Sequence, residues 1–145
     1  MFRSKRIFLI DDDEDDHLFF EIGLNEFDPS IEILYDKDSE MALRRLSEKM
    51  HPLPDIVFLD WNMPKLSGRQ LLGAIRANEM YKAVPVIIFT TSSSEQDKEE
   101  AKQLGASQFR SKPSSLHELK KNLQEIFDSI TSLPTSLLSY SRGYT

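Results

Sequence analysis

Four places in the sequence carry side chains that could together bind a cation and a phosphate. An acidic run at 11–13 follows one apolar segment, and Asp60 follows another. Further along the chain, Thr90 and Lys112 stand at the ends of two more segments. Carboxylates are hard oxygen ligands that suit Mg²⁺, which keeps several waters and readily accepts a phosphate oxygen. If these residues meet in space, the chemistry they favour is magnesium-assisted phosphoryl transfer.

The residue types suggest separate roles within such a site. Clustered carboxylates need a counter-charge, because like charges repel and burial removes their hydration. Asp60 would be the nucleophile, since a carboxylate that attacks phosphorus forms an acyl phosphate. Lys112 could place a positive charge on the phosphate, and the Thr90 hydroxyl could donate a hydrogen bond to it. The pattern therefore predicts a protein that is phosphorylated on its own side chain.

The elements that must position these residues are short buried strands. Three runs are rich in β-branched and aromatic residues with few polar positions, which indicates strands buried on both faces: 7–10, 56–59 and 86–89. Weaker patterns predict two further strands, at 31–35 and 107–111. Apolar residues at helical spacing predict helices around 43–50, 68–75 and 116–130, and on weaker evidence the segments 19–27 and 95–104 complete the helix count.

The alternation of strands and helices predicts a (βα)5 architecture of the α/β class. Strands buried on both faces belong to parallel sheets that are covered by helices on both sides through right-handed crossovers. A doubly wound sheet binds its ligands at the carboxyl ends of the strands. The acidic run 11–13, Asp60, Thr90 and Lys112 all stand at such ends.

The composition excludes several other classes of protein. A chain of 145 residues has room for one domain of ordinary size, and its 39% hydrophobic and 29% charged residues are typical of a soluble protein. No apolar run approaches the ~20 residues of a membrane span, and no signal peptide is recognisable, so we expect a cytoplasmic protein without membrane contact. The absence of cysteine excludes thiolate metal sites. A net charge of −6 disfavours nucleic-acid binding.

The last expected helix has a recognisable start and end. Ser115 could cap its first turn while Glu118 reaches back in a capping box. The apolar stripe ends near Ile130, and residues 132–145 are rich in Ser and Thr. We therefore expect a folded domain at 1–131 and a C-terminal tail at 132–145.

The sequence resembles the response-regulator receiver family over roughly residues 6–130. The matching motifs are IFLIDD at 7–12, FLDWNMP at 58–64 with Gly68 downstream, FTTS at 89–92 and GASQFRSKP at 105–113. The resemblance implies a flavodoxin-like sheet with strand order 2-1-3-4-5. It also implies a stand-alone regulator without an output domain, and the segment 77–85 resembles the small regulators that partner phytochrome-type or hybrid histidine kinases.

The resemblance also implies a role for each matching residue. Asp60 would be the phosphoacceptor, and the donor would be a histidine kinase or a histidine phosphotransfer protein. Asp12 and Asp60 would bind Mg²⁺ directly, Asn62 through its backbone carbonyl, and Asp11 through water. Such a protein catalyses only its own phosphorylation and dephosphorylation.

The family switches between two states when it is phosphorylated. Thr90 would follow the phosphoryl group inward together with Phe109, the switch aromatic. Lys112 would contact the phosphoryl group, and the peptide bond between Lys112 and Pro113 would be cis. The altered surface would bind a downstream protein target. Members of the group often self-associate, so a homodimer is possible, to which the apolar residues of the tail could contribute: Leu137, Leu138 and Tyr140.

Three alternatives share some of these residues. A haloacid-dehalogenase-type phosphatase also begins with Asp-x-Asp, as at Asp11 and Asp13, but that class has Thr or Val where Asp15 stands. An EF-hand loop could use the same three aspartates, but Asp16 replaces its Gly and Ile22 its closing Glu. A degenerate receiver that serves only as an interaction module also stays open.

Some residues near the site have plainer interpretations. Glu14, Asp15 and Asp16 favour a solvated helix start, where carboxylates interact well with the helix dipole. Phe109 could be an ordinary core aromatic. No histidine has ligand spacing, and we expect all three at the surface: His17, His51 and His117.

Overall fold

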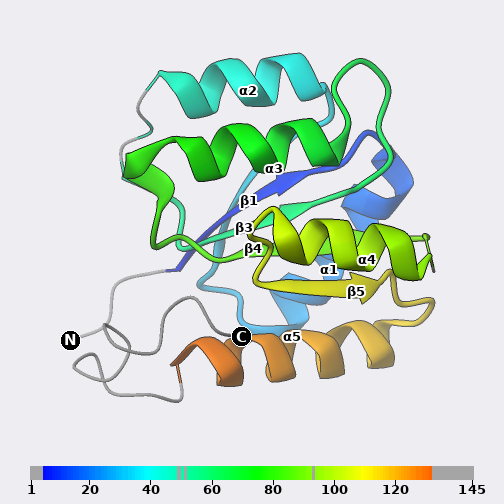
Figure 1. The fold of residues 1–145 in the computed structure, drawn as a ribbon. Helices are drawn as coiled ribbons and strands as arrows, with labels where there is room; N and C mark the ends of the chain where they lie inside the picture. The colour runs from blue at the N-terminus through cyan, green and yellow to red at the C-terminus, as the bar shows by residue number, and fades with distance from the viewer. Residues whose placement is uncertain (1–4, 49, 51, 93, 132–145) are drawn as a thin grey trace.

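The computed structural model describes residues 5–48, 50, 52–92 and 94–131 (Figure 1). Its strands form a single five-stranded sheet in the order β2-β1-β3-β4-β5, and every neighbouring pair is parallel. The strand bounds are β1 Arg6–Ile10, β2 Glu32–Asp36, β3 Ile56–Leu59, β4 Val86–Thr90 and β5 Gln108–Ser111. The predicted α/β fold and its strand order, 2-1-3-4-5, are confirmed.

Helices cover both faces of this sheet (Figure 1). Their bounds are α1 Glu14–Phe27, α2 Ser39–Ser47, α3 Gly68–Ala77, α4 Glu95–Gln103 and α5 Leu116–Thr131, with a short 3₁₀ helix η1 at Glu79–Tyr81. Helices α1 and α5 pack on one face, and α2, α3 and α4 lie on the other. In the described part of the chain, no helix is both long and apolar enough to cross a membrane.

The two faces of the sheet build two separate cores. Successive residues of a strand point to opposite faces, so Phe8 and Val57 join the core beneath α2 and α3, while Ile7 and Phe58 join the core beneath α1 and α5. All residues of β3 and β4 are buried. This double burial explains why the central strands are continuous apolar runs without alternation.

Two helix starts differ in detail from the prediction. Helix α1 begins at Glu14 because the Asp13 side chain caps it, accepting the N–H groups of Asp15 (2.9 Å) and Asp16 (3.0 Å). At α5 the Ser115 hydroxyl accepts the N–H of Glu118 at 3.1 Å, as predicted. The Glu118 carboxylate, however, accepts the N–H of Ser114 at 3.2 Å instead of that of Ser115. The predicted tail, 132–145, lies outside the described residues.

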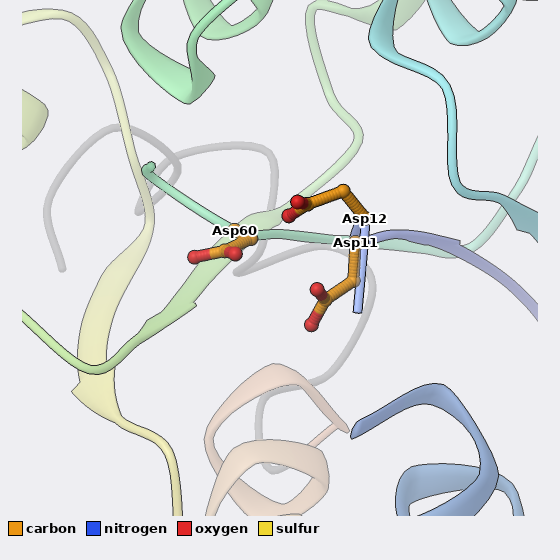
Figure 2. A group of neighbouring side chains, drawn as sticks. All are labelled: Asp11, Asp12 and Asp60. Atoms are coloured by element: carbon orange, nitrogen blue, oxygen red, sulfur yellow. The ribbon is translucent and has the colours of Figure 1, made fainter. Parts of the chain in front are cut away.

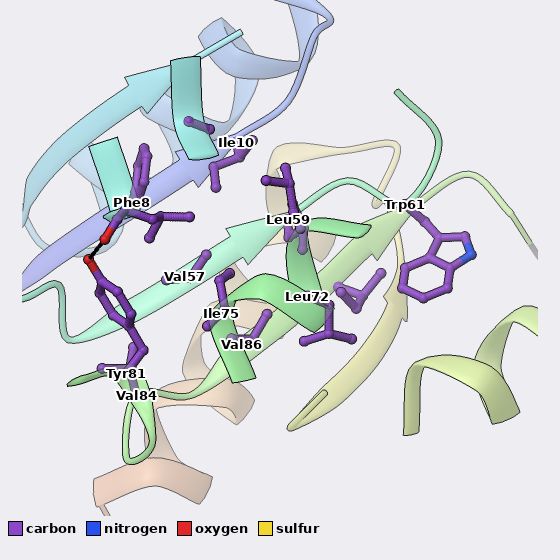
Figure 3. Close-up of a cluster of buried hydrophobic side chains, with 14 of the residues drawn as sticks. Phe8, Ile10, Val57, Leu59, Trp61, Leu72, Ile75, Tyr81, Val84 and Val86 are labelled. Atoms are coloured by element: carbon purple, nitrogen blue, oxygen red, sulfur yellow. Dashed lines mark hydrogen bonds between the residues drawn. The ribbon is translucent and has the colours of Figure 1, made fainter. Parts of the chain in front are cut away.

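Tyr81 provides a test of the core beneath α2 and α3. Its side chain is fully buried, and its hydroxyl donates to the Leu46 carbonyl at 2.6 Å, which joins η1 to the end of α2 (Figure 3). Tyr81→Phe leaves that carbonyl without this donor, and we expect the free energy of unfolding to fall by roughly 1–2 kcal/mol in urea titrations.

Tyr35 offers a matched control for this substitution. Its hydroxyl oxygen is also buried but has no hydrogen-bond partner among the described residues. Tyr35→Phe is therefore expected to leave the stability unchanged or to raise it, because no bond is lost and a buried polar group is removed. Equal losses in the two variants would contradict the assignment of the Tyr81 bond.

Candidate functional site

The carboxyl edge of the sheet brings three of the predicted aspartates together. Asp11 and Asp12 follow β1 and Asp60 follows β3, its neighbour in the sheet, where the Asp60 N–H donates to the Ile10 carbonyl at 3.0 Å. Each carboxylate offers an oxygen, and these oxygens all lie within 4.8 Å of one another (Figure 2). Asp11 and Asp60 are buried, whereas Asp12 faces solvent. The arrangement is a cluster of oxygen ligands with one open side.

Lys112 reaches the same cluster from the end of β5. Its Nζ lies 2.9 Å from Asp11 Oδ2 and 3.4 Å from Asp60 Oδ2. Its backbone N–H donates to the Thr90 carbonyl at 2.9 Å, which fixes the end of β5 beside the end of β4. The structure thus brings together residues that are up to about a hundred positions apart in the sequence, as their places at the carboxyl ends of parallel strands predict.

Burial makes this cluster electrostatically unusual. Burial raises the pKa of Asp11 to about 6, although the Asp13 N–H and the Lys112 ammonium favour the charged form. Burial also raises the pKa of Asp60, against the opposing charge of Lys112. For Lys112 itself burial acts to lower the pKa, but its carboxylate partners outweigh burial and raise it. One ammonium does not neutralise the cluster, so a further cation is favoured.

The ligand set fits a hard divalent cation such as Mg²⁺. Mg²⁺ binds through one or two carboxylates and keeps several waters, which requires a site that is partly open to solvent. Asp12 provides an exposed carboxylate, and Asp11 and Asp60 provide buried ones. Burial disfavours the charged form of the buried carboxylates and raises their pKa values, so a bound cation would stabilise them. Thiolate ligands, which favour soft metals, are absent because the sequence has no cysteine.

The Asp11 carboxyl predicts a pH dependence of stability in the metal-free protein. Its pKa is about 6 in the folded protein against 3.8 as the unperturbed value, so between these pH values the folded state binds a proton that the unfolded chain releases. The contribution of this group to stability therefore rises as the pH falls through 6. In urea titrations with EDTA, the gain on going from pH 7 to pH 5 should be larger for the wild type than for Asp11→Asn. An identical pH response in the two proteins would contradict the raised pKa.

The loop after β3 holds Asn62 next to the acceptor candidate. The Asn62 N–H lies 3.5 Å from Asp60 Oδ1, at the outer limit for a hydrogen bond. The loop returns at the start of α3, where the Gly68 N–H donates to the Trp61 carbonyl at 2.9 Å. The structure thus places Asn62 beside Asp60, while the predicted metal contact of its carbonyl stays a prediction.

Thr90 and its neighbours connect the site to α4. Thr90 is fully buried at the end of β4, and its hydroxyl oxygen accepts the N–H of Ser92 at 3.2 Å. The Ser92 hydroxyl in turn donates to the Asp97 carboxylate in the first turn of α4, at 2.7 Å. A displacement of Thr90 would therefore act on the loop that leads into α4.

Phe109 lies in β5 and is half-buried against the core beneath α2 and α3. Its ring meets the buried Trp61 ring edge-on, with centroids 6.3 Å apart. The guanidinium of Arg69 also lies over the Trp61 ring, 5.4 Å from its centroid. Arg69 Nη2 donates to Glu100 Oε1 of α4 at 2.8 Å. Partial burial fits a movable aromatic as well as a core residue, so the switch role of Phe109 stays a prediction.

Pro113 lines a small cavity beneath the site. The cavity measures about 30 Å³, which is enough for a water molecule. Its polar walls come from Asp11, Asp16, Asp60 and Lys112, and the rest of its lining is mainly apolar. Pro113 is thus part of the site's floor.

Asp16 is the site residue that the sequence interpretation missed. Its Oδ2 lies 2.6 Å from Lys112 Nζ, nearer than either Asp11 or Asp60. The expectation of a solvated helix start fits Asp15, which is exposed. Asp16 also lies in the first turn and its side chain is 40% exposed, but that expectation did not include its ion pair with Lys112. A signal was present, because Asp16 lies four residues before the buried Phe20 and so shares the inward face of α1.

The expectation that the histidines lie at the surface holds for one of the two described histidines. His117 is exposed, as expected. His17 is half-buried and stacks on Tyr35 with ring centroids 3.5 Å apart, because both side chains meet between α1 and β2. The surface assignment of His17 is therefore wrong, while His51 lies outside the described residues.

The cap of α1 also decides against the EF-hand alternative. Such a loop needs Asp11, Asp13 and Asp15 as ligands around one ion. The Asp13 side chain instead caps α1, and the oxygens that converge belong to Asp11, Asp12 and Asp60.

A comparison with known protein families identifies the family to which this site belongs. The family model of the response regulator receiver domain matches residues 7–124. The chain belongs to this family. Receiver domains are signalling modules of two-component systems, which agrees with the predicted family and sets the dehalogenase-type alternative aside.

Individual relatives agree with this assignment. The chain is 29% identical over 126 residues to the response regulator Rcp1 of Synechocystis sp., with 84% of this chain and 86% of Rcp1 covered. It is 35% identical over 101 residues to the probable methanogenesis regulatory protein FilR2 of Methanothrix harundinacea, covering 69% of this chain and 65% of FilR2. Against the phosphate regulon regulator PhoB of Escherichia coli it spans 54% of the relative. The chain thus spans between half and two thirds of several longer relatives.

Two solved structures of single-domain regulators have the same fold. The phosphorylated cyanobacterial phytochrome response regulator RcpA superposes with a TM-score of 0.80 at 25% identity, covering 91% of this chain and 98% of RcpA. The Mn²⁺-bound form of Rcp1 gives a TM-score of 0.77 at 28% identity, with the same coverage. The predicted likeness to phytochrome-associated regulators is therefore confirmed at the level of fold and sequence.

Proposed function

We propose that this receiver accepts a phosphoryl group on Asp60 from a phosphohistidine of a histidine kinase or a phosphotransfer protein. The observation that carries the proposal is the convergence of Asp11, Asp12, Asp60 and Lys112 at one edge of the sheet. A solved relative, RcpA, is phosphorylated, which supports the same chemistry here.

Asp60 supplies the nucleophile in this reaction. Its two oxygens meet Lys112 at 3.4 Å and the Asn62 N–H at 3.5 Å, so neither oxygen is tightly held and a lone pair stays available. One oxygen forms a bond to phosphorus while the bond from phosphorus to the donor imidazole breaks, and the electron pair of that bond leaves with the imidazole. The product is an acyl phosphate on Asp60.

Lys112 and the metal ligands hold the charge that the phosphoryl group brings. Asp12 and Asp60 would hold Mg²⁺ directly, Asp11 through water and Asn62 through its carbonyl. Mg²⁺ would neutralise charge on the transferring oxygens. The Mn²⁺-bound form of Rcp1 supports a divalent cation in a site of this kind. Lys112 contributes a point charge from the opposite side.

Phosphorylation would switch the surface formed by α4, β5 and α5. Among the described residues the Thr90 hydroxyl donates to no acceptor, so it could donate to a phosphoryl oxygen. Its movement would pull on Ser92 and Asp97 at the start of α4. The space that Thr90 leaves would admit Phe109, which now packs edge-on against Trp61. The two states would then differ in affinity for a downstream protein target.

The remaining expectations belong to the same proposal. Residues 1–131 would form the receiver domain and 132–145 a tail. The protein would act in the cytoplasm as a stand-alone regulator and could pair as a homodimer. Its catalysis would be confined to its own phosphorylation and dephosphorylation.

A chemical experiment tests the acceptor directly. The wild type is incubated with acetyl phosphate, with Mg²⁺ or with EDTA, and its intact mass is measured. We expect a gain of one phosphoryl group that requires Mg²⁺. Borohydride reduction of the acyl phosphate followed by peptide mapping should place homoserine at position 60. No gain in mass, or reduction at another residue, would overturn the proposal.

A further inference from the structure

The carboxylate nearest to Lys112 has no part in the proposed chemistry. Lys112 Nζ lies 2.6 Å from Asp16, 2.9 Å from Asp11 and 3.4 Å from Asp60. An ammonium group has three N–H donors, and these three carboxylates match them in number. The longest of the contacts is the one to Asp60, the residue that Lys112 must serve.

The carboxylates that contact the ammonium come from different elements of the fold. Asp16 projects from the first turn of α1, whereas Asp60 follows β3 in the sheet. The Lys112 side chain is 14% exposed and Asp16 is 40% exposed. A half-exposed ion pair adds little to stability, since water screens it and the paired side chains lose conformational freedom. Because Asp16 lies beside the site, however, it can determine where the flexible Lys112 ammonium lies.

The position of the ammonium affects the availability of Asp60. Without Asp16, the same charge is shared between Asp11 and Asp60 alone, and the ammonium is drawn closer to both. An ammonium in close contact with those oxygens competes with a divalent cation for the same lone pairs. It also reduces the electron density of the attacking oxygen.

We propose that Asp16 is a positioning residue for Lys112, a role that rests on the proposed function of the site. Asp16 holds the ammonium off Asp60 in the resting protein, so that the Asp60 oxygens stay available to metal and phosphorus. It also keeps the ammonium within reach of an incoming phosphoryl oxygen. Asp16 acts on the metal ligands and on the acceptor through Lys112.

A double-mutant cycle with a binding readout tests this role. The Kd for Mg²⁺ is measured by isothermal titration calorimetry on the full chain, for the wild type, Asp16→Asn, Lys112→Met and the double variant. We expect Asp16→Asn to raise the Kd roughly fivefold to tenfold in the wild-type background and less than about twofold when Lys112 is Met. An effect of equal size in both backgrounds would mean that Asp16 acts by long-range charge alone, and the proposal would fail.

Asp15 provides a matched charge control. It is exposed, lies one residue earlier in the same turn of α1, and makes no contact with Lys112 among the described residues. Asp15→Asn removes the same charge and is expected to change the Kd less than about twofold, since exposed charges are screened. Asp16→Glu keeps a carboxylate and should recover part of the affinity that Asp16→Asn loses.

The outcomes separate this inference from the proposed function. If the wild type binds Mg²⁺ and is phosphorylated but Asp16→Asn and Asp15→Asn behave alike, only the role of Asp16 is overturned. If the wild type neither binds Mg²⁺ nor gains a phosphoryl group, the proposed function fails and takes this inference with it.

Discussion

Asp60→Asn is expected to eliminate phosphorylation by acetyl phosphate and, in the same protein, to stabilise the metal-free fold. The amide keeps the size of the side chain but cannot act as a nucleophile, so the rate should fall by more than about a thousandfold. The stability gain follows from burial, which raises the pKa of Asp60 and therefore opposes its charged form. Lys112 keeps two carboxylate partners, Asp11 and Asp16.

Two measurements on one variant check this pair of effects. Intact mass after incubation with acetyl phosphate and Mg²⁺ reports the acceptor, and urea unfolding at pH 7 in EDTA reports the stability. The exposed Asp15→Asn serves as the control, because it should keep the mass gain of the wild type and should not gain stability, since it loses a favourable helix-dipole interaction of about 0.3–1 kcal/mol. A phosphorylated Asp60→Asn protein would move the acceptor to another residue, and a less stable one would contradict the cost of the buried charge.

The sequence is informative about this site because the fold places strand ends together. Asp11, Asp60 and Thr90 each follow a strand that is recognisable from its apolar run, and Lys112 follows the more weakly patterned β5. Parallel strands bring their carboxyl ends to one edge. The meeting of these residues at one edge is therefore predictable without knowing any side-chain contact, whereas the strand order is predicted only through the resemblance to the receiver family.

The residues that were misjudged depend on facts that apolar runs do not carry. The helical spacing from Asp16 to the apolar Phe20 indicates that Asp16 lies on the inward face of α1, but it does not reveal that Lys112, far away in the sequence, is its partner. His17 is half-buried because Tyr35 on β2 offers a flat partner, a contact between segments far apart in sequence. The choice of Asp13 as a cap, and not a ligand, likewise depends on where the helix begins.

Gly68→Ala is the structural change from which we expect the largest loss. A Cβ at Gly68 would overlap the Asp60 carbonyl oxygen and lie 2.7 Å from Trp61 Cα, and both obstacles are backbone atoms that cannot turn aside. Either the start of α3 or the strand end that carries Asp60 must then move. We expect the free energy of unfolding to fall by roughly 2–4 kcal/mol in urea titrations, with weaker Mg²⁺ binding in the fraction that folds.

Gly73 in the same helix makes the matched control for this steric argument. Nothing lies within 4 Å of a Cβ placed there, and the residue sits inside α3, where glycine weakens a helix. Gly73→Ala should therefore raise the stability by roughly 0.5–1 kcal/mol while Gly68→Ala lowers it, although the chemical change is identical. Opposite signs would show that the close approach of α3 to the backbone of Asp60 holds the acceptor in place. Two substitutions of the same sign would mean that the loop after β3 yields to the added methyl group, so that the position of Asp60 must be fixed by its contacts with β1 and Lys112 instead.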